Sequence, residues 1–262
     1  MTTATGNESS GHPPVLVLRK IRQILECFST ENPALTLYEI RQRSGLPQST
    51  CQRLVQNLVR EGFLDRRGGD YRIGLQLVRW STTGTQGLDL VRVVDPVLVE
   101  LREQTNESAC LFVRDGPFRT LIALQEARHQ LVQRLAVGMV MPLHAGTGRV
   151  FLAYDDAALD DAKEYGLRRL TPNTVTKTAV LEELLEKTRA DGYVVSHEER
   201  DIGISSISAP VFGPRGELLA VIGVAGPVMR LGAEEPVIVK AVVVAGQTAS
   251  SRLGFRETTT DL

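Results

Sequence analysis

Polar side chains at the start of one short segment, residues 45–63, carry hydrogen-bonding groups that suit a nucleic acid. The segment is GLPQSTCQRLVQNLVREGF, and its amides, hydroxyls and guanidinium stand at Gln48, Ser49, Thr50, Gln52 and Arg53. Such groups bind base edges and phosphates, and arginine is the commonest reader of guanine. The segment therefore predicts either a surface that reads DNA or an ordinary solvated face.

Apolar side chains in the same segment indicate which way those polar groups point. They recur at helical spacing, at Cys51, Leu54, Val55, Leu58 and Val59. A stripe of this width suits a helix that packs one side against a core. We therefore expect a helix whose polar face, near its N-terminus, is directed outward.

Two further helices precede this one. Residues 15–28 have apolar side chains at helical spacing, which predicts the first helix. The second begins with Thr36 and Glu39 in a capping-box pattern and ends at Gly45, a residue that favours the left-handed exit of a helix. A short turn then leads into the third helix.

A β-hairpin is predicted after the third helix. Residues 63–74 alternate in polarity, turn at Gly68 and Gly69, and alternate again. This order of elements is that of a winged helix-turn-helix, which places its third helix in the major groove of DNA. Arg66 and Arg67, at the hairpin tip, are expected to approach the DNA backbone or minor groove. The alternative is that the fold serves as a protein-interaction module.

The charge of the chain is unevenly distributed. Residues 15–80 contain 11 Lys and Arg against 6 Asp and Glu, although the whole chain has a net charge of −1. A basic segment in an otherwise acidic protein suggests that a polyanion, here double-stranded DNA, meets only that segment.

Composition sets the broad class of the protein. With 262 residues, 42% of them hydrophobic, the chain can form one large domain or two ordinary ones. Residues 1–14 are polar and are expected to be a disordered arm, and no apolar run reaches the length of a membrane span, so a cytoplasmic location is expected. Cys27, Cys51 and Cys110 lie far apart in apolar segments, which favours reduced core thiols.

The remaining sequence divides into three parts. After the winged helix-turn-helix of residues 15–74, residues 75–106 are predicted to form a helical connector that is broken near residues 81–87. Residues 107–254 mix strands and helices without a regular βαβ repeat, which predicts an α+β fold with an antiparallel sheet. Strands are expected at 109–115, 119–127, 193–199, 203–212 and 217–226, helices at 155–166, 179–192 and 234–254, and a tail at 255–262.

The pattern of residues gives little support to enzymatic or metal chemistry. His144 and His197 suggest a hydrolase by residue type, because Ser205 and Ser206 and the carboxylates Glu198 and Glu199 lie close together in this part of the sequence. No GxSxG elbow, HExxH motif or paired-cysteine ligand set accompanies them. We therefore predict no catalytic residue, no metal and no cofactor.

Taken together, these segments resemble the IclR family of transcription regulators over about residues 15–252. The resemblance is carried, in the family's order, by GLPQSTCQRLVQNLVREGFLDR with its hairpin, DPVLVELREQTNES, MPLHAGTGRVFLA, DGYVVSHEERDIGISSISAPVFGPRGELLAVIGVAGP and MRL. It implies a C-terminal domain that binds a small-molecule effector. It also implies a homodimer formed largely through the DNA-binding region and the connector, and often a homotetramer.

Symmetric assembly agrees with the way that helix-turn-helix proteins bind DNA. One helix-turn-helix reads few base pairs, so two copies on a near-palindromic operator are expected. Apolar positions in the connector are expected to supply the dimer contact, namely Leu88, Leu90, Val91, Val94, Val97, Leu98 and Leu101.

The resemblance also implies where the effector binds. The family commonly lines its pocket with the loop after PLHA and with strands that follow the DGY helix. In this sequence those positions fall on Gly146, Thr147, Ser196, Ser206, Gly223 and Ala225.

Departures from the family pattern bear on the class of effector. The loop HAGTGR is one residue shorter than usual, and Arg149 replaces a lysine. Ser196 stands where an acidic residue is common, and Gly223 and Ala225 stand where sensors of small acids have hydroxyls. Space combined with uncharged donors favours a small aromatic or similarly bulky effector and the control of a catabolic operon. A regulator of small aliphatic acid metabolism, or a non-DNA interaction module on the same scaffold, is the alternative.

Overall fold

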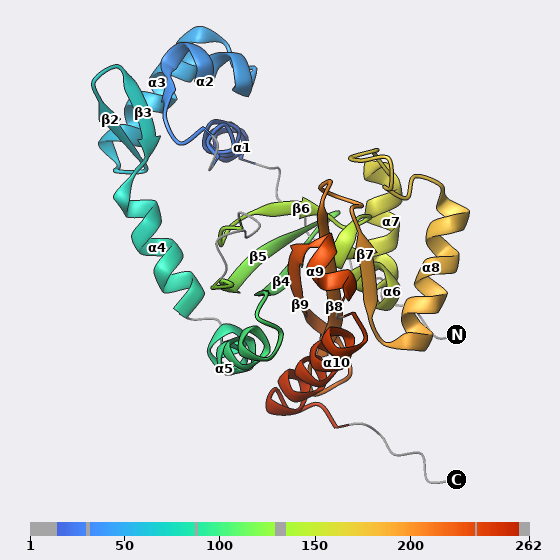
Figure 1. The fold of residues 1–262 in the computed structure, drawn as a ribbon. Coiled ribbons are helices and arrows are strands. Elements are labelled where there is room, and N and C mark those ends of the chain that lie inside the picture. The colour runs from blue at the N-terminus through green and yellow to red at the C-terminus, as the bar shows by residue number, and fades with distance from the viewer. Residues whose placement is uncertain (1–14, 30–31, 87–88, 129–134, 234, 257–262) are drawn as a thin grey trace, which may run out of the picture. The chain divides into compact units, whose positions relative to one another are not determined.

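The computed structural model describes residues 15–29, 32–86, 89–128, 135–233 and 235–256 (Figure 1). Contacts between residues divide the chain into two units, Met1–Gly84 and Thr85–Leu262. Each unit has its own buried hydrophobic residues and its own sheet. None of the helices in the described ranges is long and apolar enough to cross a membrane.

The N-terminal unit contains a helix-turn-helix and a small sheet. Its helices are α1 (Leu16–Leu25), α2 (Leu37–Ser44) and α3 (Gln48–Arg60), and its strands are β1 (Leu35–Thr36), β2 (Leu64–Arg67) and β3 (Asp70–Ile73). The strands pair antiparallel in the order β1-β3-β2. The predicted winged helix-turn-helix is therefore confirmed, with β1 as an additional strand.

Local sequence explains where α2 begins and ends. The Thr36 hydroxyl accepts a hydrogen bond from the Glu39 backbone N–H at 3.3 Å, and the Glu39 carboxylate accepts one from the Thr36 N–H at 2.8 Å. This capping box satisfies two N–H groups that the helix start would leave without partners. Gly45 ends the helix at φ +67, where a side chain would be strained. The short α2 is thereby held in place for the turn into α3.

The apolar stripe of α3 packs into the core of the unit, as the sequence predicts. Cys51, Leu54, Val55 and Leu58 are buried with side chains from α1, α2 and the sheet. The opposite face of α3 remains exposed.

The connector consists of α4 (Leu75–Gln86) and α5 (Asp89–Thr105). The sequence predicts a break near residues 81–87, but α4 continues through most of that stretch, and residues 87–88 lie outside the described residues. A single glycine such as Gly84 costs only about 1 kcal/mol inside a helix, which explains why the helix persists there.

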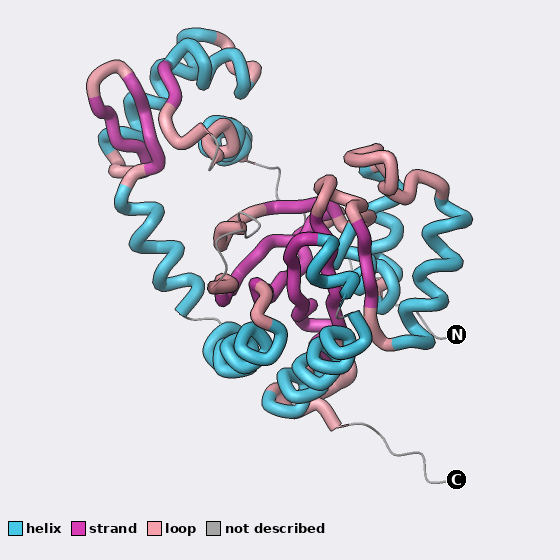
Figure 2. The backbone as a smooth tube through the Cα atoms, viewed as in Figure 1, coloured by secondary structure: helices cyan, strands magenta, loops and turns pink. Residues whose placement is uncertain are grey.

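The C-terminal unit is built on a six-stranded antiparallel sheet, visible at the centre of Figure 2. The strand order is β6-β5-β4-β9-β8-β7. The strands are β4 (Ser108–Asp115), β5 (Phe118–Gln125), β6 (Val140–Pro142), β7 (Val194–His197), β8 (Ile204–Phe212) and β9 (Leu218–Pro227). The predicted α+β class with an antiparallel sheet is confirmed.

Helices cover both faces of this sheet. They are the short η1 (Gly146–Gly148), α6 (Arg149–Tyr154), α7 (Asp156–Tyr165), α8 (Thr178–Asp191), α9 (Val228–Ala233) and α10 (Glu235–Arg252). On β4, Ala109 and Leu111 pack with α5 and α10, whereas Cys110 and Phe112 pack with α6, α7 and α8. Alternate residues of one strand therefore belong to two separate cores.

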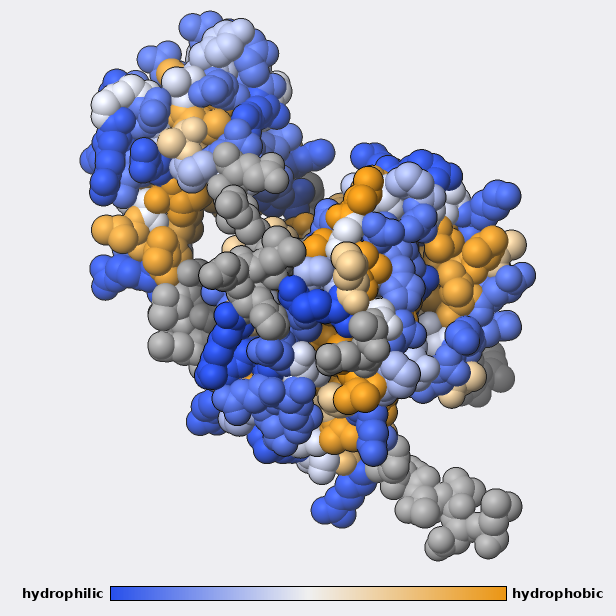
Figure 3. Space-filling view, viewed as in Figure 1, coloured by the Kyte–Doolittle hydropathy of each residue, from blue (hydrophilic) through white to orange (hydrophobic). Residues whose placement is uncertain are grey.

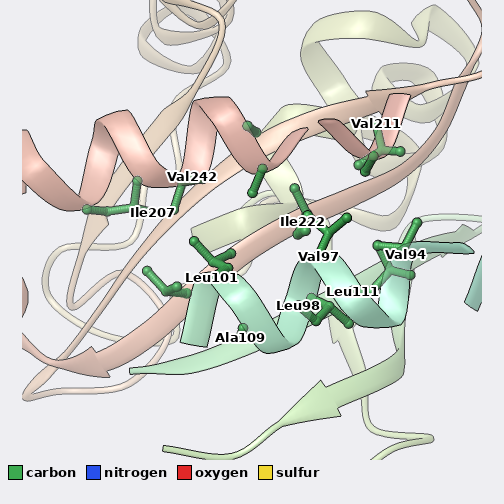
Figure 4. Close-up of a cluster of buried hydrophobic side chains, with 14 of the residues drawn as sticks. Val94, Val97, Leu98, Leu101, Ala109, Leu111, Ile207, Val211, Ile222 and Val242 are labelled. Atoms are coloured by element: carbon green, nitrogen blue, oxygen red, sulfur yellow. The ribbon is translucent and has the colours of Figure 1, made fainter. Parts of the chain in front are cut away.

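The connector side chains that were expected at a dimer contact lie instead in the first of these cores (Figure 4). Val94, Val97, Leu98 and Leu101 are buried against the sheet and α10, and Leu90 and Val91 pack partly against them. Leu88 lies outside the described residues. The prediction that these residues supply the dimer contact is wrong for Val94, Val97, Leu98 and Leu101, because α5 buries them against a sheet of its own chain.

Candidate functional site

The outward face of α3 presents the polar residues that the sequence singles out. Ser49, Gln52 and Arg53 are exposed and Thr50 is half-buried. Gln48, at the first position of α3, accepts a hydrogen bond from the Arg41 guanidinium at 3.3 Å, so it is held against α2. The face offers amide, hydroxyl and guanidinium groups within the first two turns of the helix.

The hairpin of the same unit presents two arginines. Arg66 and Arg67 are exposed on β2, next to a turn in which Gly68 has φ +64. The Arg66 guanidinium carbon lies 5.7 Å from the centroid of the Tyr71 ring, and the buried ring restrains it by a cation–π contact. The two arginines therefore lie exposed on a short β-ribbon, and arginine is one of the residue types that contact phosphate.

A cavity in the C-terminal unit gathers most of the positions expected for an effector. Gly146, Thr147, Ser196, Ser206 and Ala225 line it. They come from η1 and from strands β7, β8 and β9, which are far apart in sequence. The cavity has a volume of about 30 Å³, about the space of one water molecule.

Gly223 differs from the other expected positions, since it is not among the described residues that line the cavity. A Cβ atom at Gly223 would lie 2.4 Å from the Ile207 carbonyl oxygen and 2.9 Å from the Ser208 Cβ. Atoms of β8, which pairs with β9 in this register, therefore occupy the space beside Gly223. The expectation that Gly223 leaves free volume for a ligand is wrong for this packing reason.

Apolar and charged side chains complete the wall of the cavity. Phe112, Leu135, Met141 and Ile204 supply the apolar part, and Arg119, Glu199, Arg200 and Asp201 supply the charged part. None of these eight residues was expected at the effector site from the sequence. The cavity is therefore more strongly charged than the expected set of small and hydroxyl residues indicates.

A buried ion pair holds the loop and the sheet together beside the cavity. The guanidinium of Arg149 lies 2.8 Å from the Glu199 carboxylate, and the two side chains are 6% and 9% exposed. Glu199 also accepts a hydrogen bond from the Gly146 N–H at 3.1 Å, and Arg149 donates to the Val195 carbonyl at 2.8 Å. Burial lowers the pKa of Arg149, and the Glu199 charge partly opposes that effect.

Arg119 is the most deeply buried charge at the cavity, with 2% of its surface exposed. It is on β5, and its guanidinium donates to the Pro142 carbonyl and lies 5.5 Å from the Phe112 ring centroid. Burial, and to a smaller extent the positive charge of Arg200, lower the pKa of Arg119 to about 9. A signal for this residue exists in the sequence, because Arg119 occupies an inward position of a strand whose other inward residues are apolar.

Residue types typical of hydrolases do meet at another point of the sheet. The His197 Nδ1 lies 3.0 Å from the Ser205 Oγ, and its Nε2 lies 3.2 Å from the Glu235 carboxylate. Ser205 is 1% exposed, so its hydroxyl is out of reach of a substrate. The group therefore ties β7, β8 and α10 together.

Neither His144 nor any group of potential metal ligands in the described residues forms a further site. His144 is buried, its Nε2 lies 2.9 Å from the Arg168 carbonyl oxygen, and burial lowers its pKa. No group of three or more potential metal ligands occurs within the described ranges. His144 is therefore explained by its contact with the backbone.

Family models match both units of the chain. Residues 17–68 match the IclR helix-turn-helix domain, and residues 82–251 match the bacterial transcriptional regulator IclR C-terminal domain. The chain belongs to the IclR family. It is a ligand-responsive DNA-binding transcription regulator and not an enzyme.

Relatives of known function share the family. The transcriptional repressor IclR of Escherichia coli is 29% identical over 216 residues, which is 80% of this chain and 79% of that protein. The Pca operon regulatory protein of Acinetobacter baylyi is 26% identical over 215 residues, 79% of this chain and 77% of that protein.

Solved structures show the same architecture. An IclR regulator from Alicyclobacillus acidocaldarius matches 92% of this chain and 100% of its own at a TM-score of 0.82 and 25% identity. An IclR homologue from Microbacterium hydrocarbonoxydans, complexed with 4-hydroxybenzoate, matches 90% of this chain and 98% of its own at a TM-score of 0.78 and 25% identity.

The buried Arg149–Glu199 pair gives a prediction about stability. Replacing Glu199 by Ala leaves the buried Arg149 charge without its carboxylate, so the free energy of unfolding is expected to fall by about 3–5 kcal/mol. The combined change Arg149→Met and Glu199→Leu is expected to cost less than Glu199→Ala alone, because no unpaired charge remains. Urea unfolding followed by circular dichroism measures both.

An exposed pair provides the control. Lys163 and Glu182 lie 2.8 Å apart with side chains 36% and 51% exposed, so Glu182→Ala is expected to cost about 1 kcal/mol or less. Equal losses for Glu199→Ala and Glu182→Ala would contradict a structural role for the buried pair.

Proposed function

We propose that this IclR-family regulator controls a catabolic operon in response to a small aromatic compound or one of similar bulk. The observation that carries the proposal is the cavity, which combines an apolar wall of Phe112, Leu135 and Met141 with the hydroxyls of Thr147 and Ser206. One solved relative supports the aromatic class, since it is complexed with 4-hydroxybenzoate, and the Pca operon regulatory protein supports the control of an operon. As a regulator that acts on DNA, it would work in the cytoplasm.

Binding of such a ligand requires the cavity to open. Pockets for drug-sized ligands span about 300–1,000 Å³, whereas this cavity has about 30 Å³. The ligand therefore selects an opened conformation, and the equilibrium between the closed and opened forms is the element that the effector shifts. We propose that this shift between the closed and opened forms changes how the N-terminal unit binds DNA.

Binding of effectors tests this proposal. Calorimetry on the full chain is expected to show 4-hydroxybenzoate binding at least tenfold more tightly than pyruvate or glyoxylate, because the apolar wall favours a ring. Ala225→Phe places a large side chain in the cavity and is expected to abolish the binding. Ala190→Phe, at an exposed position of α8, is the matched control and is expected to leave it unchanged.

Selective binding of pyruvate or glyoxylate would instead favour the alternative, a regulator of small aliphatic acid metabolism. The cavity as such would then still be the effector site if Ala225→Phe prevents that binding.

For DNA, we propose that the α3 face and the hairpin have different tasks. Gln48, Ser49, Thr50, Gln52 and Arg53 would contact base edges and nearby phosphates, and Arg66 and Arg67 would contact phosphate. The support is their exposure on one unit and the groups that they present. The target would be double-stranded DNA with a near-palindromic operator, because one copy reads few base pairs.

Arginine replacements separate the two tasks. Arg53→Ala is expected to cost about 1–3 kcal/mol on the operator and little on random duplex, because a base contact is lost. Replacing Arg66 and Arg67 by Ala is expected to weaken all duplexes alike and to reduce the salt slope by about one unit per contact. Fluorescence anisotropy measures both the loss of affinity and the salt slope, with duplex DNA from upstream of the gene for this protein at several salt concentrations.

Equal losses on operator and random duplex for Arg53→Ala would contradict base readout by this residue. If no duplex is bound in a salt-sensitive way, the alternative is favoured, namely an interaction module that does not bind DNA.

We further propose a homodimer formed through the N-terminal unit and the start of α4. Leu16 and Leu18 on α1 and Leu75 on α4 are exposed, Leu75 by 69%. Figure 3 shows hydrophobic side chains gathered over the first turns of α4. Exposed apolar groups on successive turns suit burial against a second copy. A tetramer would then be a pair of such dimers.

Sedimentation tests the dimer. The full chain is expected to sediment as a dimer or larger at micromolar concentration, and Leu75→Glu is expected to shift it toward monomer because a charge is costly in an apolar interface. Val237→Glu, at an exposed position of α10, is the matched control. A monomer at every concentration for the unaltered chain would overturn this proposal.

A further inference from the structure

We propose that Arg119 is the counter-charge for a carboxylate of the effector, so that the cavity binds an aromatic acid and discriminates against its neutral amide. This inference rests on the proposed function and names the chemical group that the cavity recognises.

Arg119 differs from the other charged residues that line the cavity, because each of those forms an ion pair with a described residue. Glu199 is paired with Arg149 at 2.8 Å, and Arg200 is paired with Asp201 at 2.6 Å. Among the residues that the structure describes, no carboxylate forms an ion pair with Arg119. Glu199 and Asp201 act on it only at longer range, and their effect is smaller than that of burial.

The contacts that Arg119 does make are with groups that carry no net charge. They are the Pro142 carbonyl, the Met141 sulfur at 3.9 Å from a terminal nitrogen, and the face of Phe112. Its Nε and the hydroxyl of Thr147 are buried without a hydrogen-bond partner in the described part of the chain. Buried polar groups normally have partners, so two orphan groups on one cavity indicate a missing acceptor. A carboxylate accepts hydrogen bonds from both.

The turn at η1 is shaped around this guanidinium. A Cβ atom at Gly148 would lie 2.6 Å from one terminal nitrogen of Arg119, and one at Gly146 would lie 3.4 Å from the other. The Gly-Thr-Gly sequence therefore lets the backbone approach the arginine closely and places Thr147 next to it. Two donors without partners, the Arg119 Nε and the Thr147 hydroxyl, therefore belong to residues that line the same cavity.

The apolar wall determines what the carboxylate is attached to. Phe112, Leu135 and Met141 face the same cavity and offer hydrocarbon and ring surface. An arene carboxylate satisfies the two donors with its oxygens and covers the apolar wall with its ring. A neutral amide of the same shape puts an N–H₂ group where only acceptors are needed.

The test compares an acid with its isosteric amide on the full chain. Calorimetry is expected to show 4-hydroxybenzoate binding at least tenfold more tightly than 4-hydroxybenzamide to the unaltered protein. Arg119→Gln is expected to weaken the acid about thirtyfold or more and to leave the amide unchanged, because only the acid loses a buried charge partner. Arg119→Lys keeps the charge without the planar fork and is expected to give an intermediate affinity.

A second arginine serves as the matched control. Arg189 also donates to a backbone carbonyl, that of Ala153 at 2.9 Å, and it is not among the residues that line the cavity. Arg189→Gln is expected to leave the preference for the acid intact.

A stability measurement separates a binding role from a structural one. Without ligand, Arg119→Gln is expected to melt at the same temperature as the unaltered protein or higher, because it removes a buried charge that has no carboxylate partner. A purely structural arginine would give a lower melting temperature together with equal losses for acid and amide, and that result would overturn the inference.

The outcomes also separate this inference from the proposed function. Equal affinities of the unaltered protein for acid and amide would overturn the role of Arg119 and leave the aromatic effector in place. Binding of pyruvate that is lost in Arg119→Gln, with no binding of 4-hydroxybenzoate, would keep the counter-charge and overturn the aromatic class. Failure of all these carboxylates to bind at millimolar concentration would overturn the inference. If Arg119→Gln fails to fold, the ratio of the affinities for acid and amide is compared between the unaltered protein and Arg119→Lys. A ratio that is the same in both proteins would overturn the role of Arg119.

Discussion

The sheet of the C-terminal unit is apolar on both faces, and the requirement to cover both faces governs the rest of that unit. One face is buried by α5 and α10, and the other by α6, α7 and α8. The cavity lies on the second face, and α5, the second connector helix, lies on the first. The central strand β4 therefore has side chains on the face that holds the cavity and others on the face that α5 covers.

This arrangement offers a physical route between ligand and connector. On β4, Phe112 lines the cavity and its neighbour Leu111 packs in the core that includes Val94 and Leu98 of α5. A ligand that displaces Phe112 would therefore act on a strand whose neighbouring residue packs against α5, and close-packed cores respond to such a shift by repacking. Coupling within this unit thus requires no dedicated chain of polar contacts, only two stable packings of α5 on the sheet.

The sequence predicts those parts whose signals are local. The stripe of α3, the capping box of Thr36 and Glu39, and the glycine turn of the hairpin each depend on residues a few positions apart, and all are present in the structure. The short strands β1 and β6, with two and three residues, carry no such periodic signal and were missed.

Long-range contacts account for the other differences. Arg119 has its carbonyl partner 23 residues away, and Gly223 is filled by a neighbouring strand whose register no local pattern reveals. Likewise, the periodicity of residues 89–105 indicates an apolar face on α5 but not which surface covers it. The family resemblance placed five residues around the cavity, whereas its charge came from strand positions that only the assembled sheet brings together.

The small volume of the closed cavity also affects how quickly the regulator can respond. A space of about 30 Å³ admits no ring, so an encounter is productive only while the cavity is open. At high effector concentration the observed binding rate then reaches a plateau equal to the rate of opening, and collisions no longer limit it. The apparent affinity is reduced by the fraction of time spent open. In the proposed mechanism, the stability of the closed cavity therefore sets both the effector concentration that is needed and the delay of the response.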